Sequence, residues 1–193
     1  AYTVVRQGLS FFNFLSLEYG VERTLDLPVS AYQLDWSKDG SVIVFASGEF
    51  DIQYLFASAE QQQQISEEAA SRAEKSKIYV ADTKGSVINV LSDRKYSLYS
   101  PRLSPDGEYV AYFTVEGANA DIWVMKLDGS YNRRIVNSKY NELFPVWSDD
   151  GARIIFSADY KGVYDLYEVD IDGANIVELL SDQSVKVALD TFV

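Results

Sequence analysis

Two stretches of this sequence align residue for residue: Tyr99-Ser-Pro-Arg-Leu-Ser-Pro-Asp-Gly107 and Leu143-Phe-Pro-Val-Trp-Ser-Asp-Asp-Gly151. Their final glycines are 44 residues apart. A second pair, Ile122-Trp-Val-Met-Lys-Leu-Asp-Gly129 and Leu166-Tyr-Glu-Val-Asp-Ile-Asp-Gly173, repeats with the same spacing of 44 residues. Self-similarity at a fixed period of this length is typical of a repeat architecture. The chain therefore contains at least two copies of one structural unit.

An earlier copy of the unit runs through Leu34-Asp-Trp-Ser-Lys-Asp-Gly40 and continues at Ile78-Tyr-Val-Ala-Asp-Thr-Lys-Gly85. Within each copy, short β-rich runs alternate with turns that end in glycine, which is the pattern of tight antiparallel hairpins. Four antiparallel strands in roughly 40 to 50 residues make one blade of a β-propeller. The predicted fold is therefore all-β, with about three and a half four-stranded antiparallel blades that belong to a larger propeller.

The spacing also predicts how the blades divide the chain. We expect residues 1–193 to form a single partial propeller, and because propellers ordinarily need about four to eight blades, we favour a piece of a longer protein. Self-association, or a second chain that completes the ring, is the alternative. The predicted parts are a half blade at 11–27, blades at 34–91, 94–136 and 139–181, and the start of a next blade or a terminal strand at 182–193.

The first full copy is longer than the others. Its two marker glycines, Gly40 and Gly85, are 45 residues apart, whereas Gly107 and Gly129 are only 22 apart. About 23 extra residues therefore lie near 50–72, and the run 59–74 is rich in helix formers without glycine or proline. We expect a short surface helix there, which is either a tolerated loop excursion or an arm that binds a partner.

The composition excludes several classes of function. The formal net charge of −12 repels phosphate backbones, so nucleic acid is not an expected partner. The chain has no histidine and no cysteine, which removes Ser-His-Asp triads, thiolate nucleophiles and nearly all transition-metal sites. We expect no catalytic residue, no cofactor and no metal site. The apolar stretch at 11–17 is less than half of a membrane span, so membrane insertion is not expected either.

Three segments carry a family resemblance: Trp36-Ser-Lys-Asp-Gly40, Leu103-Ser-Pro-Asp-Gly107 and Trp147-Ser-Asp-Asp-Gly151. Each is followed by an Ile/Leu-Trp/Tyr strand and an Asp-Gly-like turn, and the pattern resembles the PD40 (WD40-like) repeat of TolB-like propellers over residues 11–181. The resemblance implies a noncatalytic scaffold that interacts with proteins, in the periplasm, the cell envelope or outside the cell. A cytoplasmic location stays open.

Two alternative functions stay open at this point. The same repeat occurs in propellers that gate prolyl-oligopeptidase-like hydrolases, in which case the catalytic domain is not in this chain. The chain could also be a structural subunit of a larger assembly. A Gly-x-Ser-x-Gly nucleophile elbow elsewhere in the protein would favour the gated enzyme.

The acidic and aromatic residues of the repeat have simple structural explanations. Asp170, Asp172 and Asn175 are spaced somewhat like a calcium loop, and Asp39, Asp106 and Asp149-Asp150 could form an acidic ring. We favour turns in both cases, because aspartate before glycine bonds to its own backbone. The recurring rings are predicted to fill the core between blades: Trp36, Tyr79, Trp123, Trp147 and Tyr167.

One end of the blades is the predicted partner-binding surface. Successive antiparallel strands return to opposite ends of a blade, so the insertion and the connections between blades emerge together, away from the Asp-Gly hairpins. Aromatic side chains next to lysine make good contacts with proteins, although packing at the blade rim is the simpler explanation. The predicted contact residues are Tyr96, Tyr99, Tyr140, Phe144, Tyr160, Tyr164 and, in the insertion, Ile65.

Overall fold

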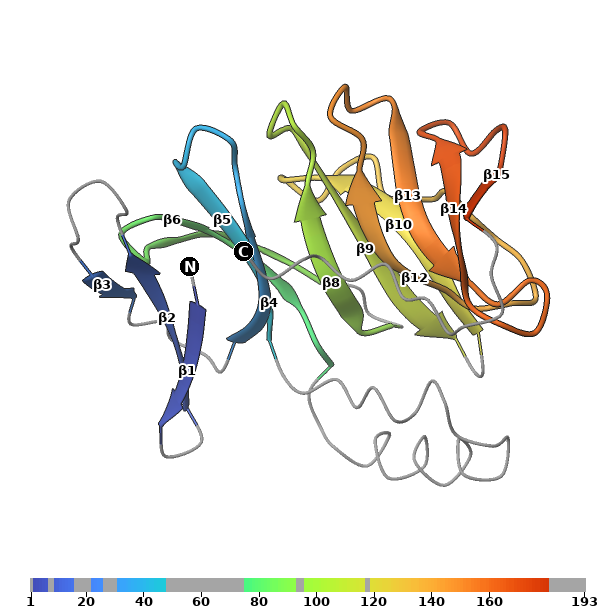
Figure 1. Ribbon diagram of the computed structural model, residues 1–193. Coiled ribbons are helices and arrows are strands. Elements are labelled where there is room, and N and C mark those ends of the chain that lie inside the picture. Colours follow the sequence, from blue (N-terminus) through green and yellow to red (C-terminus); the bar gives the residue numbers. More distant parts are fainter. Residues whose placement is uncertain are drawn as a thin grey trace.

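The structure is a computed structural model that describes residues 2–6, 9–15, 22–25, 31–47, 75–92, 96–116 and 119–180. Every regular element in these ranges is a β-strand, and the strands form four antiparallel sheets that follow one another along the chain (Figure 1). The predicted all-β fold of propeller blades is confirmed. Within the same ranges, no helix is long and apolar enough to cross a membrane.

The sheets comprise a three-stranded N-terminal sheet and three four-stranded blades, whose strands pair in chain order. The first strands of neighbouring blades contact one another, as strands at the centre of a propeller do. The N-terminal sheet contains β1 (Tyr2–Arg6), β2 (Leu9–Leu15) and β3 (Glu22–Leu25); the first blade β4 (Ala31–Trp36), β5 (Val42–Ser47), β6 (Ile78–Asp82) and β7 (Val87–Leu91); the second blade β8 (Leu98–Leu103), β9 (Tyr109–Glu116), β10 (Asn119–Lys126) and β11 (Arg133–Arg134); and the third blade β12 (Glu142–Trp147), β13 (Arg153–Ala158), β14 (Asp165–Asp170) and β15 (Val177–Leu180).

The N-terminal sheet differs from the half blade expected at 11–27. Strand β1 lies before that range and pairs with β2 from Tyr2 opposite Asn13 to Arg6 opposite Leu9. This sheet therefore takes a third strand from the same chain, one that the predicted half blade did not include. The predicted insertion near 50–72 and the segment 182–193 lie outside the described residues.

The turn between the first two strands of each blade is the same structure three times. In the first blade, the Ser37 hydroxyl donates to Asp39 Oδ1 at 2.6 Å, and the Ser41 N–H donates to the same oxygen at 3.0 Å. Gly40 adopts φ +70° and donates its N–H to the Ser37 carbonyl. The turns at 104–108 and 148–152 repeat these bonds. The interpretation of these aspartates as turn residues is confirmed.

Gly173 is the glycine whose replacement we expect to cost most. It has φ +88°, and a Cβ atom built on it would lie 2.8 Å from the backbone carbonyl oxygen of Ile135 in the second blade. Gly107 has φ +72°, but a Cβ atom built on it would have no other atom within 4 Å. Gly107→Ala therefore isolates the cost of the backbone conformation alone, about 1 kcal/mol. Gly173→Ala should reduce the free energy of unfolding by at least about 1 kcal/mol more, measured by urea denaturation. Equal losses would show that Gly173 does not approach the Ile135 carbonyl as described.

The first strand of each blade contains a β-bulge. The bulges include Gln33, Ser100 and Phe144, which have φ between +50° and +53°, although none is glycine. Side chains of β4 bond to the bulged strand of the next blade, since Gln33 Oε1 accepts from the Ser100 N–H at 2.9 Å and Asp35 Oδ2 from the Leu103 N–H at 2.7 Å. These bonds connect the first blade to the second.

Apolar layers between neighbouring blades form the core. Trp147 is 9% exposed and donates its Nε1–H to the Arg102 carbonyl of the second blade at 2.9 Å. Trp36 occupies the same repeat position in the first blade but is 45% exposed, so the prediction that it lies in the inter-blade core is wrong. The neighbour on that side is the N-terminal sheet, which has three strands instead of four among the described residues. Tyr167 is buried as predicted, and Tyr79 and Trp123 are partly buried against the core.

Candidate protein-interaction surface

The described residues of the predicted surface lie at one end of the blades, which we call the loop end. It comprises the connections before β8 and β12, residues 96–97 and 137–141, and the loop between β13 and β14, residues 159–164. Tyr96 and Tyr140 lie in the connections, and Tyr160 and Tyr164 lie in the loop. Ile65 lies outside the described residues.

Two of the predicted contact residues are not at the surface. Phe144 and Tyr164 are each only 7% exposed and belong to the core between the second and third blades. Phe144 sits in the bulge of β12, and its ring meets the ring of Phe113 edge-on at 5.6 Å. Tyr99 is half-buried and also packs against Phe113, at 5.4 Å. The expectation that all of these rings form an exposed surface is corrected, because packing at the blade rim accounts for most of them.

A cluster of rings extends from this core to the surface of the third blade. The Tyr160 ring lies 4.6 Å from that of Tyr167 and 6.5 Å from that of Phe156, and it meets the Tyr140 ring edge-on at 5.4 Å. Lys139 is exposed, and its Nζ lies 5.1 Å from the centroid of the Tyr140 ring. Tyr140 is therefore the outermost ring of a cluster whose inner members are fixed by the core, and a cation lies over it.

Hydrogen bonds fix the connection 137–141 that carries Tyr140. The Asn141 N–H donates to Asp159 Oδ1 at 2.8 Å, and the Asn141 amide nitrogen donates to Asp159 Oδ2 at 3.2 Å. Asn141 Oδ1 accepts from the Ala120 N–H of the second blade at 3.1 Å. Ser97, at the equivalent position before β8, accepts from the Ser76 N–H in the same way at 3.1 Å. One residue before each of these blades thus ties the loop end to the preceding blade.

Glu142 is a residue that the sequence interpretation missed. It is the first residue of β12 and is fully buried, and its Oε1 accepts from the Ser138 hydroxyl at 2.5 Å. Burial, with smaller contributions from the nearby carboxylates of Asp121 and Asp159, raises the pKa of Glu142 to about 7. Leu98 and Ala31 occupy the same repeat position in the other blades. A charged residue at a repeat position that is otherwise apolar was the signal in the sequence.

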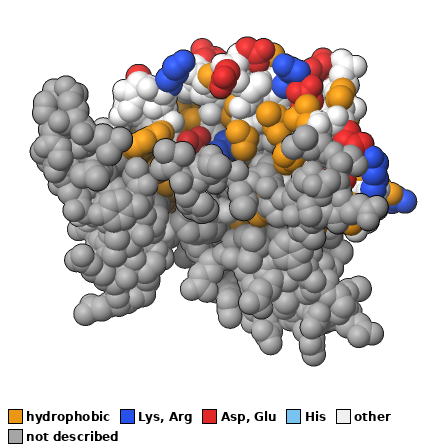
Figure 2. All heavy atoms as spheres, viewed as in Figure 1, with side chains coloured by type: hydrophobic (Ala, Val, Ile, Leu, Met, Phe, Trp, Pro, Cys, Tyr) orange, Lys and Arg blue, Asp and Glu red, His pale blue; other side chains and the backbone are white. Residues whose placement is uncertain are grey.

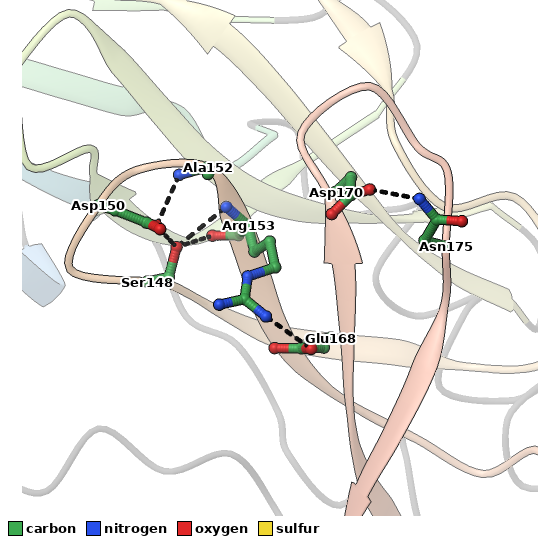
Figure 3. A network of polar contacts seen from close by, with 7 residues as sticks. All are labelled: Ser148, Asp150, Ala152, Arg153, Glu168, Asp170 and Asn175. Carbon is green, nitrogen blue, oxygen red and sulfur yellow. Dashed lines mark hydrogen bonds and ion pairs between the residues drawn. The ribbon is translucent and has the colours of Figure 1, made fainter.

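The opposite end of the blades, which we call the hairpin end, carries most of the charged side chains visible along the upper rim of Figure 2. The carboxylates of Asp39, Asp106 and Asp150 are bonded within their own turns. Hydrogen bonds from the Ser37 hydroxyl and the Ser41 N–H lower the pKa of Asp39 to about 2. In the third blade, Ser148, Asp150 and Ala152 form the same turn, and Arg153 on β13 pairs with Glu168 on β14 at 2.8 Å (Figure 3).

The hairpin at 170–175 is also closed on itself. Asp170 Oδ2 accepts from the Asn175 amide at 2.7 Å, as Figure 3 shows, and Asp172 Oδ1 accepts from the Ala174 N–H at 2.9 Å. These bonds support the interpretation as a hairpin turn instead of a calcium loop. Among the described residues, no three acidic side chains are grouped so that they could hold a metal ion.

Comparisons with known proteins agree with this architecture. A family model described as the TolB β-propeller domain (PD40) matches residues 61–189, which is more than half of the chain. The chain belongs to this family. The Tol-Pal system protein TolB of Anaeromyxobacter dehalogenans is 38% identical over 107 residues, which cover 55% of this chain and 24% of that protein. An uncharacterized protein of Agrobacterium fabrum is 28% identical over 110 residues, covering 53% of this chain and 38% of the relative.

A solved structure has the same fold over nearly the whole TolB-like chain. The putative TolB from Agrobacterium tumefaciens superposes with a TM-score of 0.67 at 18% sequence identity, covering 95% of this chain and 58% of the other. At this identity the similarity shows the fold alone. The aligned part of the TolB-like chain spans well under half the length of each curated relative.

Proposed function

We propose that this TolB-like chain belongs to a noncatalytic propeller of the bacterial cell envelope that binds a protein partner at its loop end. The ring cluster around Tyr140 carries the proposal. A partly exposed tyrosine with a lysine over it, supported from behind by packed rings, is a preorganised contact of the kind that dominates protein interfaces.

Three further observations support this function over the alternatives. The chain lacks histidine and cysteine, so an acid–base or thiol mechanism would need other groups. At the hairpin end, the carboxylates of Asp39, Asp106 and Asp150 are engaged in their own turns. A curated relative is named as a protein of the Tol-Pal system, which favours a place in a multi-protein assembly. No specific observation favours the gating propeller or the purely structural subunit.

Site-directed cross-linking in cells tests which end binds the partner. A photoreactive amino acid at position 140 should cross-link to a protein partner, whereas one at Lys84 on the hairpin end should not. With the captured partner purified, Tyr140→Ala should weaken binding by at least about tenfold, because truncating an anchoring tyrosine costs roughly 2 kcal/mol. Lys84→Ala and Asp128→Ala, both at the hairpin end, should change the Kd less than about twofold.

The same assay tests the insertion. Deleting residues 59–74, which contain the predicted contact Ile65, should weaken the complex while the blades stay folded. Cross-linking only from the hairpin end, or unchanged affinity after both Tyr140→Ala and the deletion, would mean that the loop end is not the binding surface.

A further inference from the structure

The buried carboxyl of Glu142 is connected to the surface residue Tyr140 through one hydroxyl group. The Ser138 hydroxyl donates to Glu142 Oε1 at 2.5 Å and accepts from the Tyr140 N–H at 2.9 Å. The backbone position of Tyr140 therefore depends on where Glu142 holds Ser138. No other residue of this loop end combines full burial with a direct connection of this kind among the described residues.

The second oxygen of this carboxyl has no donor. Glu142 Oε2 is buried and has no hydrogen-bond partner within the described part of the chain. The Tyr160 hydroxyl is likewise buried without a partner in hydrogen-bonding geometry, and it lies near enough to the carboxyl to lower the pKa of Glu142. A neutral carboxyl tolerates such a site, whereas an ionised one requires donors or water for both oxygens.

The charged groups that face Glu142 are mostly acidic. Asp121 approaches from β10, where it pairs with Arg134 at 3.1 Å, and Asp159 approaches from the loop between β13 and β14. Asp165 begins β14 and lies opposite Ala158, which is itself opposite Glu142 in the sheet. Another cation of the loop end, Lys139, lies over the Tyr140 ring. One paired guanidinium among three carboxylates leaves an added negative charge on Glu142 poorly compensated.

We propose that Glu142 is a proton-dependent switch that holds the connection 137–141 closed when its carboxyl is neutral and releases it when the carboxyl ionises. Ionisation requires water at Oε2, and the connection contacts the carboxyl through the Ser138 hydroxyl. Opening moves Ser138 and frees the Tyr140 N–H. Partner binding at Tyr140 therefore weakens as pH rises, a consequence that rests on the proposed function.

Amide hydrogen exchange measured by NMR tests the switch without any partner. After correction for intrinsic rates, protection of the Tyr140 and Asn141 amides should fall about tenfold between pH 6 and pH 8, because the opened state binds fewer protons. Glu142→Gln cannot ionise and should keep protection constant over this range. Glu142→Leu places in β12 the residue that the equivalent position of β8 already has, so it should fold, and its protection should also be independent of pH. Glu108→Gln, an exposed change at the hairpin end, should match the unchanged protein.

The outcomes separate the switch from the binding function. Protection that does not change with pH, or that falls equally in Glu142→Gln, would overturn the switch. Protection that falls only when Glu142 can ionise supports it, whether or not a partner is known. Affinity of an identified partner that stays constant with pH, despite such opening, would instead count against Tyr140 as the contact.

Discussion

Glu142→Leu is expected to raise the free energy of unfolding at pH 8 and to flatten its dependence on pH. The pKa of Glu142 is about 7 in the folded chain, above the ordinary value of 4.5, so the folded state binds more protons than the unfolded state between these values. The contribution of Glu142 to stability is therefore largest below pH 4.5 and is lost as pH rises through 7. Between pH 5 and pH 8 this loss amounts to about 2 to 3 kcal/mol, and leucine removes it.

Urea denaturation at a series of pH values measures this effect. The difference between the two profiles is the informative quantity, because the hydrogen bond that Ser138 loses lowers the mutant profile by a constant amount of roughly 1 kcal/mol. Glu108→Gln should leave the pH profile unchanged. Parallel profiles for Glu142→Leu and the unchanged chain would mean that Glu142 is ionised in the folded state and that its site is better solvated than the structure shows.

The sequence was sufficient to predict the architecture because glycines mark the turns of each repeat. Glycine at φ near +70° is required in each Ser-x-Asp-Gly turn, so the spacing of Gly107 and Gly151 determines where strands end. The resemblance to PD40 repeats then identified each repeat as a propeller blade. The strand β1 was missed because the range chosen for the half blade began at Phe11, within β2.

The sequence was less informative about the candidate surface, for a reason located in β12. A strand normally sends alternate side chains to opposite faces, but the bulge between Leu143 and Val146 interrupts this alternation. Phe144 adopts φ +53° there and is buried beside the second blade, although its neighbours suggested an exposed ring. Nothing in a single sequence predicts a positive φ at phenylalanine. The burial of Glu142 was detectable only by comparing it with Leu98 and Ala31 at the same repeat position.

Phe156→Ala is expected to have the largest effect on stability among the changes considered. Phe156 is completely buried, and its ring lies 6.0 Å from that of Tyr167 and 6.5 Å from that of Tyr160. Phe45 and Tyr112 occupy the same repeat position and are equally buried, so a large ring is needed here in every blade. Removing the ring leaves a cavity between the second and third blades and should lower the free energy of unfolding by about 3 to 5 kcal/mol.

Ile155→Ala is the matched control, because Ile155 is the neighbouring residue on the other face of β13 and is only partly buried. It should cost about 1 to 2 kcal/mol, since fewer contacts are lost there. Because Tyr160 supports Tyr140, Phe156→Ala should also increase exchange of the Tyr140 amide under conditions where the blades remain folded, whereas Ile155→Ala should not. Similar losses from the two substitutions would show that the third blade does not pack against the second through this face. The ring cluster would then lack the support that makes Tyr140 a preorganised contact.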